Sequence, residues 1–220
     1  MPWYLVALSE SQEIGTILPF VQSRDPGEIS SVLKAVLSGP EMPSDEDQAL
    51  NQPRNIQFEL WLATTLWRAG AAVALREPDL ECTLSGTRIL VACKRLFSLR
   101  KLTRRINEAT EQLRHAVRAT SATGGIIAIS LSRVLGATDR SQQIAGRPQA
   151  MAILASRIEN VVERRAKWRQ SHEAQAILFQ LASMFTNLAT DRIESGSFIT
   201  MYGDGPVAAT VAQALQSVAE

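Results

Sequence analysis

Hydrophobic residues recur with two different periods along this chain. From residue 54 onward, helical spacing alternates with short apolar or alternating runs that are typical of strands. The expected order is a helix at 54–70, strands at 71–77, 79–84 and 87–94, a helix at 98–120, a strand at 124–132, a helix at 148–170, strands at 174–182 and 197–202, and a helix from 206 onward. Strands that alternate with helices in this way imply an α/β fold with helices packed against a sheet.

The first 53 residues follow a different pattern. The apolar run at 3–8 predicts a short strand, and an Asp-Pro start with apolar residues at helical spacing predicts a helix over 25–39. Residues 39–53 contain three prolines and a short acidic run, which indicates an exposed linker. We therefore expect an N-terminal appendage and linker over 1–53 and a main domain over 54–220, since the first segment is too short to bury much surface alone.

Composition narrows the class of protein without identifying it. The 23 basic and 22 acidic residues give a net charge of +1, so only local clustering of charge can indicate a charged partner. Two cysteines are too few for a disulfide framework, and they lack the spacing of a zinc site. No signal peptide and no apolar run long enough to cross a bilayer are visible. We expect a cytoplasmic protein with no membrane partner.

Candidate chemistry lies in the predicted hairpin at 77–96. Asp79 follows a proline at the start of one strand, and Lys94 lies near the end of the next strand, two residues after Ala92. Residues two apart on a strand share a face, so an acid at position 92 would lie across the hairpin from Asp79 and beside Lys94. Two carboxylates, with the Cys93 carbonyl as a further oxygen, are ligands that Mg²⁺ prefers. Lys94 would then orient a water molecule or stabilise phosphate charge.

These residues, with Glu59 in the preceding helix and Gln112 in the following one, carry a family resemblance. Residues 54–132 resemble the PD-(D/E)xK nuclease superfamily. The resemblance implies a restriction-endonuclease-like core with a central mixed β-sheet flanked by helices, and a Mg²⁺-dependent endonuclease, with Mn²⁺ as an alternative metal. It also assigns the site residues: catalytic roles to Asp79, Lys94, Glu59, Gln112 and position 92, and metal ligation to Asp79, Glu59 and the Cys93 carbonyl. Members of this superfamily often act in defence against foreign DNA.

The chain departs from the family pattern at position 92, where alanine replaces an acid. Either the acid was changed deliberately to inactivate an enzyme, or the site decayed naturally in a protein that no longer cleaves. The first interpretation describes a nuclease that is inactive in this form. The second describes a non-catalytic nucleic-acid-binding or assembly subunit with a nuclease-like fold.

The other candidates each have a simpler explanation. Glu59 shares the apolar stripe of its helix, so its carboxylate needs either an ion-pair partner or a metal. Gln112 is either a surface glutamine or a site residue. Glu81 lies on the same strand face as Asp79 and is a candidate to replace in part the ligand missing at position 92. Cys82 and Cys93 are expected to be small core residues.

Basic residues gather between positions 94 and 118, in a protein that is nearly neutral overall. Such a cluster beside a phosphate-cleaving site predicts a nucleic-acid-binding surface, with double-stranded DNA as the expected partner. The residues assigned to it are Arg95, Arg100, Lys101, Arg104 and Arg105. The simpler alternative is a solvated helix face, which is also the expected role of the basic residues at 164–169. Whether the chain forms a homodimer or joins a larger protein complex is left open.

Overall fold

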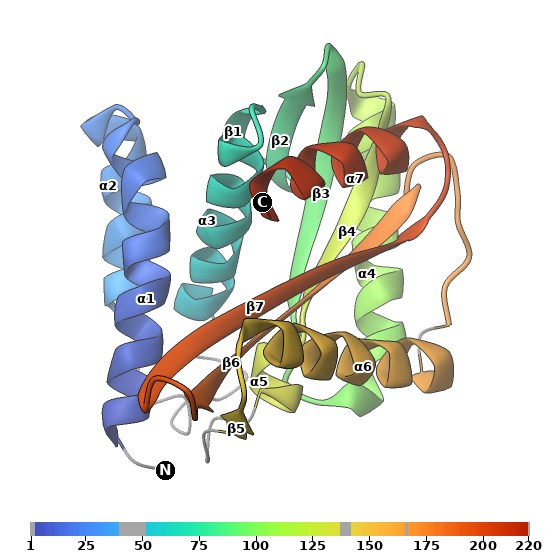
Figure 1. The fold of residues 1–220 in the computed structure, drawn as a ribbon. Coiled ribbons are helices and arrows are strands. Elements are labelled where there is room, and N and C mark those ends of the chain that lie inside the picture. Colours follow the sequence, from blue (N-terminus) through green and yellow to red (C-terminus); the bar gives the residue numbers. More distant parts are fainter. Residues whose placement is uncertain (1–2, 40–51, 137–141, 166, 220) are drawn as a thin grey trace.

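The structure, a computed structural model, describes residues 3–39, 52–136, 142–165 and 167–219. In these residues a seven-stranded mixed sheet has helices on both faces, which confirms the expected α/β class (Figure 1). The elements are α1 (Trp3–Gln22), α2 (Pro26–Leu37), α3 (Gln52–Arg68), β1 (Ala72–Arg76), β2 (Asp79–Leu84), β3 (Thr87–Arg95), the 3₁₀ helix η2 (Leu99–Lys101), α4 (Leu102–Ala119), β4 (Gly124–Ser130), α5 (Ser132–Leu135), β5 (Gln142–Ile144), α6 (Arg147–Arg165), β6 (Ala176–Asn187), β7 (Arg192–Gly203) and α7 (Pro206–Ala219).

The sheet combines an antiparallel meander with a parallel centre. β1, β2 and β3 pair antiparallel in sequence order, and β4 then lies parallel to β3, reached through α4. β6 is parallel to β4 over its first half and to β5 at its far end, while β7 pairs antiparallel along the whole of β6. Every residue of β4 is buried, as its continuous apolar run predicts for a strand covered on both faces.

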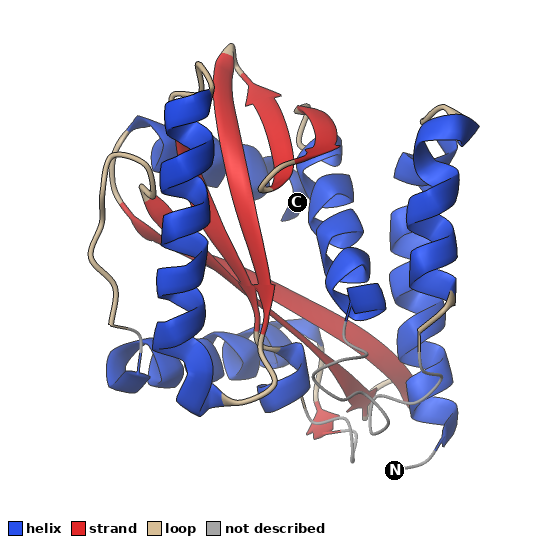
Figure 2. Cartoon of the chain, turned by 180° about the vertical axis from the view of Figure 1, so that it is seen from behind, coloured by secondary structure: helices blue, strands red, loops and turns tan. Residues whose placement is uncertain are grey.

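Two apolar clusters cover the two faces of the sheet. One contains residues of α3, α7 and the N-terminal helices, and the other contains residues of α4 and α6. Figure 2 shows α4 running along the sheet on the face opposite α7. Its buried side chains recur at steps of three and four, which places one face of the helix on the sheet: Leu102, Ile106, Ala109, Leu113 and Val117.

The prediction of a strand at residues 3–8 is wrong, because these residues belong to the long helix α1. A short apolar run does not by itself distinguish a strand from a buried helix. Apolar residues recur further along at helical spacing, and the ring of Phe20 packs edge-on against Trp67 of α3, with 6.2 Å between ring centroids. The helix predicted over 25–39 is confirmed as α2. Most of the linker predicted at 39–53 lies outside the described residues.

The second half of the chain shows further differences from the expected elements. The short elements α5 and β5 were not predicted, and α6 ends at Arg165 rather than at residue 170. β6 and β7 are each twelve residues long because they pair with each other over their full length, including polar segments that carry no strand pattern. Among the described helices, none is long and apolar enough to cross a membrane.

Candidate active site

The hairpin of β2 and β3 brings Asp79 and Lys94 together. Leu80 pairs with Val91, so Asp79 stands opposite Ala92 at the next step of the ladder. An Asp79 carboxylate oxygen, Oδ2, accepts a hydrogen bond of 2.7 Å from the backbone N–H of Cys93. The Lys94 ammonium lies 3.5 Å from the same Oδ2 and donates a 2.9 Å hydrogen bond to the Cys93 carbonyl.

A cavity of about 560 Å³, here called the central cavity, opens at this end of the hairpin. Its walls come from α3, β2, β3 and α4, although α3 and α4 pack on opposite faces of the sheet. The cavity therefore lies where the strands end and no longer separate the two helices. The residues that line it are Asn55, Glu59, Asp79, Cys93, Lys94, Arg95, Arg105, Glu108, Glu111 and Gln112. Glu59 and Gln112 thus lie in the same cavity as Asp79 and Lys94.

Burial raises the pKa of both buried carboxylates in the cavity, those of Glu59 and Asp79. The pKa of Glu59 is raised to about 7, mainly by loss of solvent and also by the negative charge of Asp79, while the charge of Lys94 acts in the opposite direction. Burial also raises the pKa of Asp79, against the lowering effects of the Lys94 charge and the Cys93 N–H. Two buried acids whose pKa values are raised create a site where added positive charge is favourable.

Ala92 contributes no oxygen to this site. It is fully buried, pairs with Ile127 of β4 and belongs to the apolar cluster beneath α4. Among the described residues, no group of three or more His, Cys, Asp and Glu side chains is arranged to hold a metal ion. The remaining donors are the carboxylates of Glu59 and Asp79 and the Cys93 carbonyl. They are hard oxygen ligands, and they fit Mg²⁺, which proteins often bind with one or two carboxylates plus water and substrate phosphate.

The suggestion that Glu81 replaces the missing ligand is wrong. Its carboxylate forms an ion pair with Arg88 of β3, with 2.8 Å between Oε2 and Nη2, and it is not among the residues that line the central cavity. The cysteine prediction is confirmed, because Cys82 and Cys93 are both free and buried. Burial raises the pKa of Cys82 to about 12, so its thiol stays protonated and unreactive near neutral pH.

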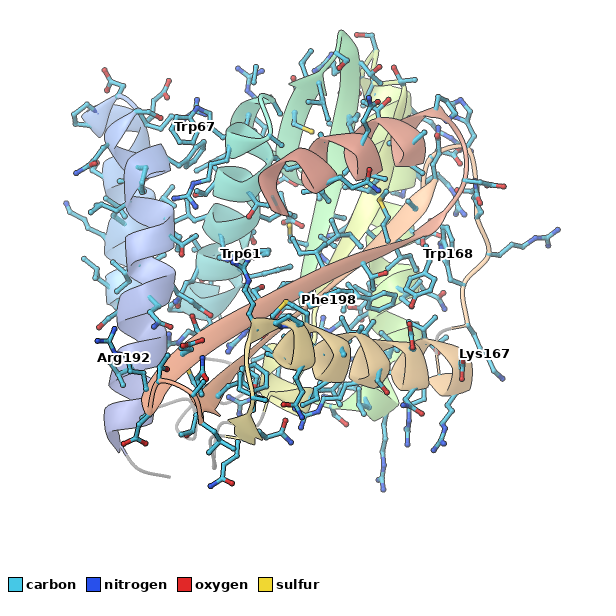
Figure 3. The ribbon with its side chains drawn as sticks, viewed as in Figure 1. Trp61, Trp67, Lys167, Trp168, Arg192 and Phe198 are labelled. Carbon is cyan, nitrogen blue, oxygen red and sulfur yellow. The ribbon has the colours of Figure 1, made fainter. Side chains whose placement is uncertain are left out.

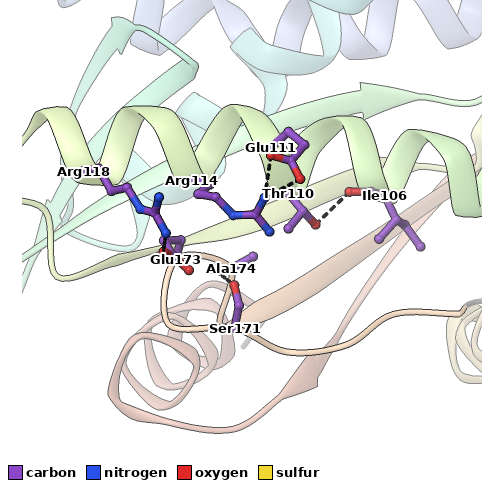
Figure 4. A network of polar contacts seen from close by, with 8 residues as sticks. All are labelled: Ile106, Thr110, Glu111, Arg114, Arg118, Ser171, Glu173 and Ala174. Carbon is purple, nitrogen blue, oxygen red and sulfur yellow. Dashed lines mark hydrogen bonds and ion pairs between the residues drawn. The ribbon is translucent and has the colours of Figure 1, made fainter.

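The arginines of α4 are more often paired with acidic side chains than the sequence indicates. Arg104 and Arg105 both form ion pairs with Glu108, at 3.5 and 2.7 Å. Further along the helix, Arg114 pairs with Glu111 and Arg118 reaches Glu173 in the segment before β6 (Figure 4).

The five residues assigned to nucleic-acid binding are consequently divided between different places. Arg95 and Arg105 line the central cavity, and Arg100 lines a separate pocket. Arg104 lies on the exposed side of α4, and Lys101 lies in η2.

Three residues of the cavity were not assigned to it from the sequence: Asn55, Glu108 and Glu111. Glu108 follows the row of Lys101 and Arg105 and precedes Gln112, at steps of four, three and four, so it shares a helix face with Gln112. This spacing is the feature of the sequence that could have placed Glu108 beside Gln112 in the site. In the sequence Glu108 is indistinguishable from a surface acid, since only the fold shows which side of this row faces the hairpin.

No protein-family model matches this sequence, and a search of curated proteins also gives no match.

Proposed function

We propose that this protein is a metal-dependent nuclease of the PD-(D/E)xK type that acts on phosphodiester bonds, with DNA as its substrate. The observation that carries the proposal is the convergence of Glu59, Asp79 and Lys94 in one cavity, where burial and the negative charge of Asp79 raise the pKa of Glu59 to about 7. The order α3, β1, β2, β3, α4, β4 supports it, because the residues of the resemblance fall on the expected elements.

Each residue has a defined task in such a site. A bound divalent cation supplies charge neutralisation at the phosphate and lowers the pKa of a water molecule. Asp79 and Glu59 would hold the cation through their carboxylate oxygens, and the Cys93 carbonyl would offer a third oxygen. Lys94 is held beside Asp79 and places its ammonium where it can stabilise negative charge on the phosphate. Gln112 lines the cavity with an amide that can donate to a phosphate oxygen.

The proposal has two forms, which differ in whether another side chain replaces the carboxylate that Ala92 lacks. In the first form of the proposal, the alanine leaves the site one carboxylate short and the chain cleaves feebly or not at all. In the second, Glu108 supplies the carboxylate from α4, since it lines the same cavity. Its ion pair with Arg105 would then have to open, which becomes favourable when a substrate phosphate provides the arginine with another anion.

The test is a nuclease assay on the full chain and on two matched variants, Ala92→Glu and Ala92→Gln. The two side chains have similar size, but only glutamate adds a charge and a metal ligand. We expect Ala92→Glu to cleave DNA with Mg²⁺ or Mn²⁺, to be silenced by EDTA, and to exceed Ala92→Gln by about a thousandfold, which corresponds to about 4 kcal/mol. Because position 92 is fully buried, thermal unfolding of both variants is measured, with Ala92→Asp as a smaller alternative.

Glu108→Gln in the unaltered chain separates the two forms. If the unaltered chain cleaves and Glu108→Gln abolishes cleavage, the acid comes from α4. If folded Ala92→Glu, Ala92→Asp and the unaltered chain are all inert on single- and double-stranded DNA and RNA with either metal, the catalytic proposal is wrong.

A specific observation favours a second candidate, a non-catalytic nucleic-acid-binding or assembly subunit. Ala92 is packed into an apolar cluster, and the described residues contain no group of three metal-binding side chains. This candidate predicts that the chain binds nucleic acid equally well with and without divalent metal, and that every variant of position 92 fails to cleave.

A further inference from the structure

A second pocket lies at the ends of β3 and α6, and its charge differs from that of the central cavity. It has a volume of about 400 Å³ and is called the arginine pocket below. The residues that line it are Phe97, Ser98, Leu99, Arg100, Arg133, Val134 and Arg165. Three of these side chains are cationic, and among the described residues that line the pocket none is acidic.

The arginines are brought together from three separate elements by specific contacts. The hydroxyl of Thr103, in the first turn of α4, donates a 3.2 Å hydrogen bond to the carbonyl of Arg165, which ties the end of α6 to the start of α4. Arg157 of α6 donates to the carbonyl of Leu135 at 3.0 Å, which fixes α5 against the same helix. These two contacts hold the segments that carry Arg133 and Arg165 at the pocket, which Arg100 of η2 also lines.

An aromatic ring connects this pocket to the central cavity. The guanidinium of Arg133 lies over the ring of Phe97, 4.6 Å from its centroid, and that of Arg95 lies 6.0 Å from the same centroid. Arg95 also lines the central cavity. Lys94 and Phe97 are three residues apart, so their Cα atoms lie at most about 11 Å from each other. That distance equals the rise of roughly three base pairs along the duplex axis.

From this arrangement we infer that the arginine pocket binds a backbone phosphate of the polynucleotide whose scissile bond lies in the central cavity. The inference deepens the proposed nuclease function and rests on it. A planar guanidinium presents several N–H donors to phosphate oxygens, and stacking on Phe97 holds that of Arg133 in one orientation. The N-terminus of the 18-residue helix α4, which directly follows η2, adds the positive end of a helix dipole.

The experiment measures binding rather than cleavage. Fluorescence anisotropy of a labelled mixed-sequence DNA duplex is followed in EDTA over a range of salt concentrations, with the full chain and with Arg133→Gln/Arg165→Gln. Each phosphate contact contributes roughly 0.9 to the slope of log affinity against log salt on duplex DNA, so the double variant is expected to lose about 1.8 from that slope. Sodium pyrophosphate serves as a competitor that carries the same anionic group without the polynucleotide.

Arg192→Gln is the matched control. Arg192 is an exposed arginine at the start of β7, beside α1, and Figure 3 shows it on the opposite side of the molecule from Lys167, which follows α6. Replacing Arg192 with glutamine removes one positive charge, as Arg165→Gln does. We expect it to leave the slope of log affinity against log salt unchanged. The single variant Arg165→Gln alters only an exposed side chain, so it keeps the test valid if the double variant is destabilised. It should lose about 0.9 from the slope.

A slope that stays the same in folded Arg133→Gln/Arg165→Gln and in Arg165→Gln overturns the inference. Binding of pyrophosphate through these arginines without any binding of duplex also overturns it, because the pocket would then serve a free phosphate compound. Failure of the pocket and failure of the nuclease proposal have different signatures. If the slope falls as expected while Ala92→Glu remains inert, the pocket stands and catalysis fails; if Ala92→Glu cleaves with an unchanged slope, only the pocket fails.

Discussion

The central cavity and the arginine pocket lie close together but handle charge in opposite ways. In the central cavity, Asp79 is held by Lys94, and Arg105 is held by Glu108. In the arginine pocket the lining supplies cations from η2, α5 and α6 and, among its described members, no acid. Burial raises the pKa of Glu59 and Asp79 in the central cavity, whereas a cluster of cations attracts mobile anions. The first arrangement suits chemistry, and the second suits substrate binding.

The comparison also shows that counting basic residues along a helix overstates a binding surface. α4 carries many arginines, but its acids at positions 108 and 111 lie three residues from arginines and pair with them. The arginines of the pocket come from segments more than thirty residues apart, so no run in the sequence marks them.

The largest effect is expected from Asp79→Asn in the Ala92→Glu background. Asparagine keeps the size of the side chain and an oxygen that can accept from the Cys93 N–H, but it removes the negative charge from the metal site. We expect the cleavage rate to fall by about a thousandfold, or about 4 kcal/mol of transition-state stabilisation. Single-turnover assays at saturating DNA measure this rate.

Duplex affinity in EDTA should change less than about twofold in the same variant, because the carboxylate repels rather than attracts phosphate. The matched variant Arg133→Gln/Arg165→Gln should show the reverse pattern, with weaker binding and a nearly unchanged rate at saturation. Equal losses of rate and affinity in both variants would remove the distinction between the two regions.

A smaller effect concerns the free energy of unfolding as a function of pH. Glu59 has a pKa of about 7 in the folded chain, against an ordinary value of 4.5, so the native state holds a proton that the unfolded state releases between these two values. Stability should therefore fall as pH rises from about 4.5 to about 7 in metal-free protein, by up to about 3 kcal/mol. Glu59→Gln stays neutral and should remove most of this decline, which makes it the more stable protein at pH 8.

Urea unfolding at several pH values measures this difference. Glu28→Gln, at an exposed position of α2, is the control and should leave the pH profile as it is. Addition of Mg²⁺ should stabilise the unaltered chain more at pH 8 than at pH 6, because the cation competes with the proton on Glu59. A pH profile that is the same for Glu59→Gln and the unaltered chain would show that this carboxylate is not buried against Asp79.

The smallest effect is expected from Arg104→Gln/Arg105→Gln. Both arginines are already paired with Glu108, so their loss should lower the salt slope of duplex binding by less than the value of roughly 0.9 for one full phosphate contact. The same anisotropy titration measures it, beside Arg133→Gln/Arg165→Gln, which removes the same number of charges. A larger loss in the α4 variant would mean that DNA displaces Glu108 from its arginines, and would move the main binding surface to α4.

Much of the fold follows from local patterns in the sequence. The apolar run of β4 and the three-and-four spacing of α4 depend only on periodicity, and both elements occur where they were expected. The region from α3 to β4 could be predicted because each of its elements carries a strong period of its own. α1, β5 and the ends of β6 and β7 could not, because their form depends on partners that are distant in the sequence.

The candidate site likewise has one part that local sequence patterns predict and another part that depends on the tertiary structure. The hairpin by itself determines that Asp79 stands opposite position 92 and on the same face as Lys94, since strand alternation and register are local properties. The tertiary structure alone decides that Glu108 and Asn55 reach the same cavity, that Glu81 is diverted to Arg88, and how strongly burial shifts the pKa of Glu59. It also decides that Arg100, Arg133 and Arg165 line one pocket. Desolvation and charge pairing depend on distances in space, and those distances exist only once helices from both faces meet at the end of the sheet.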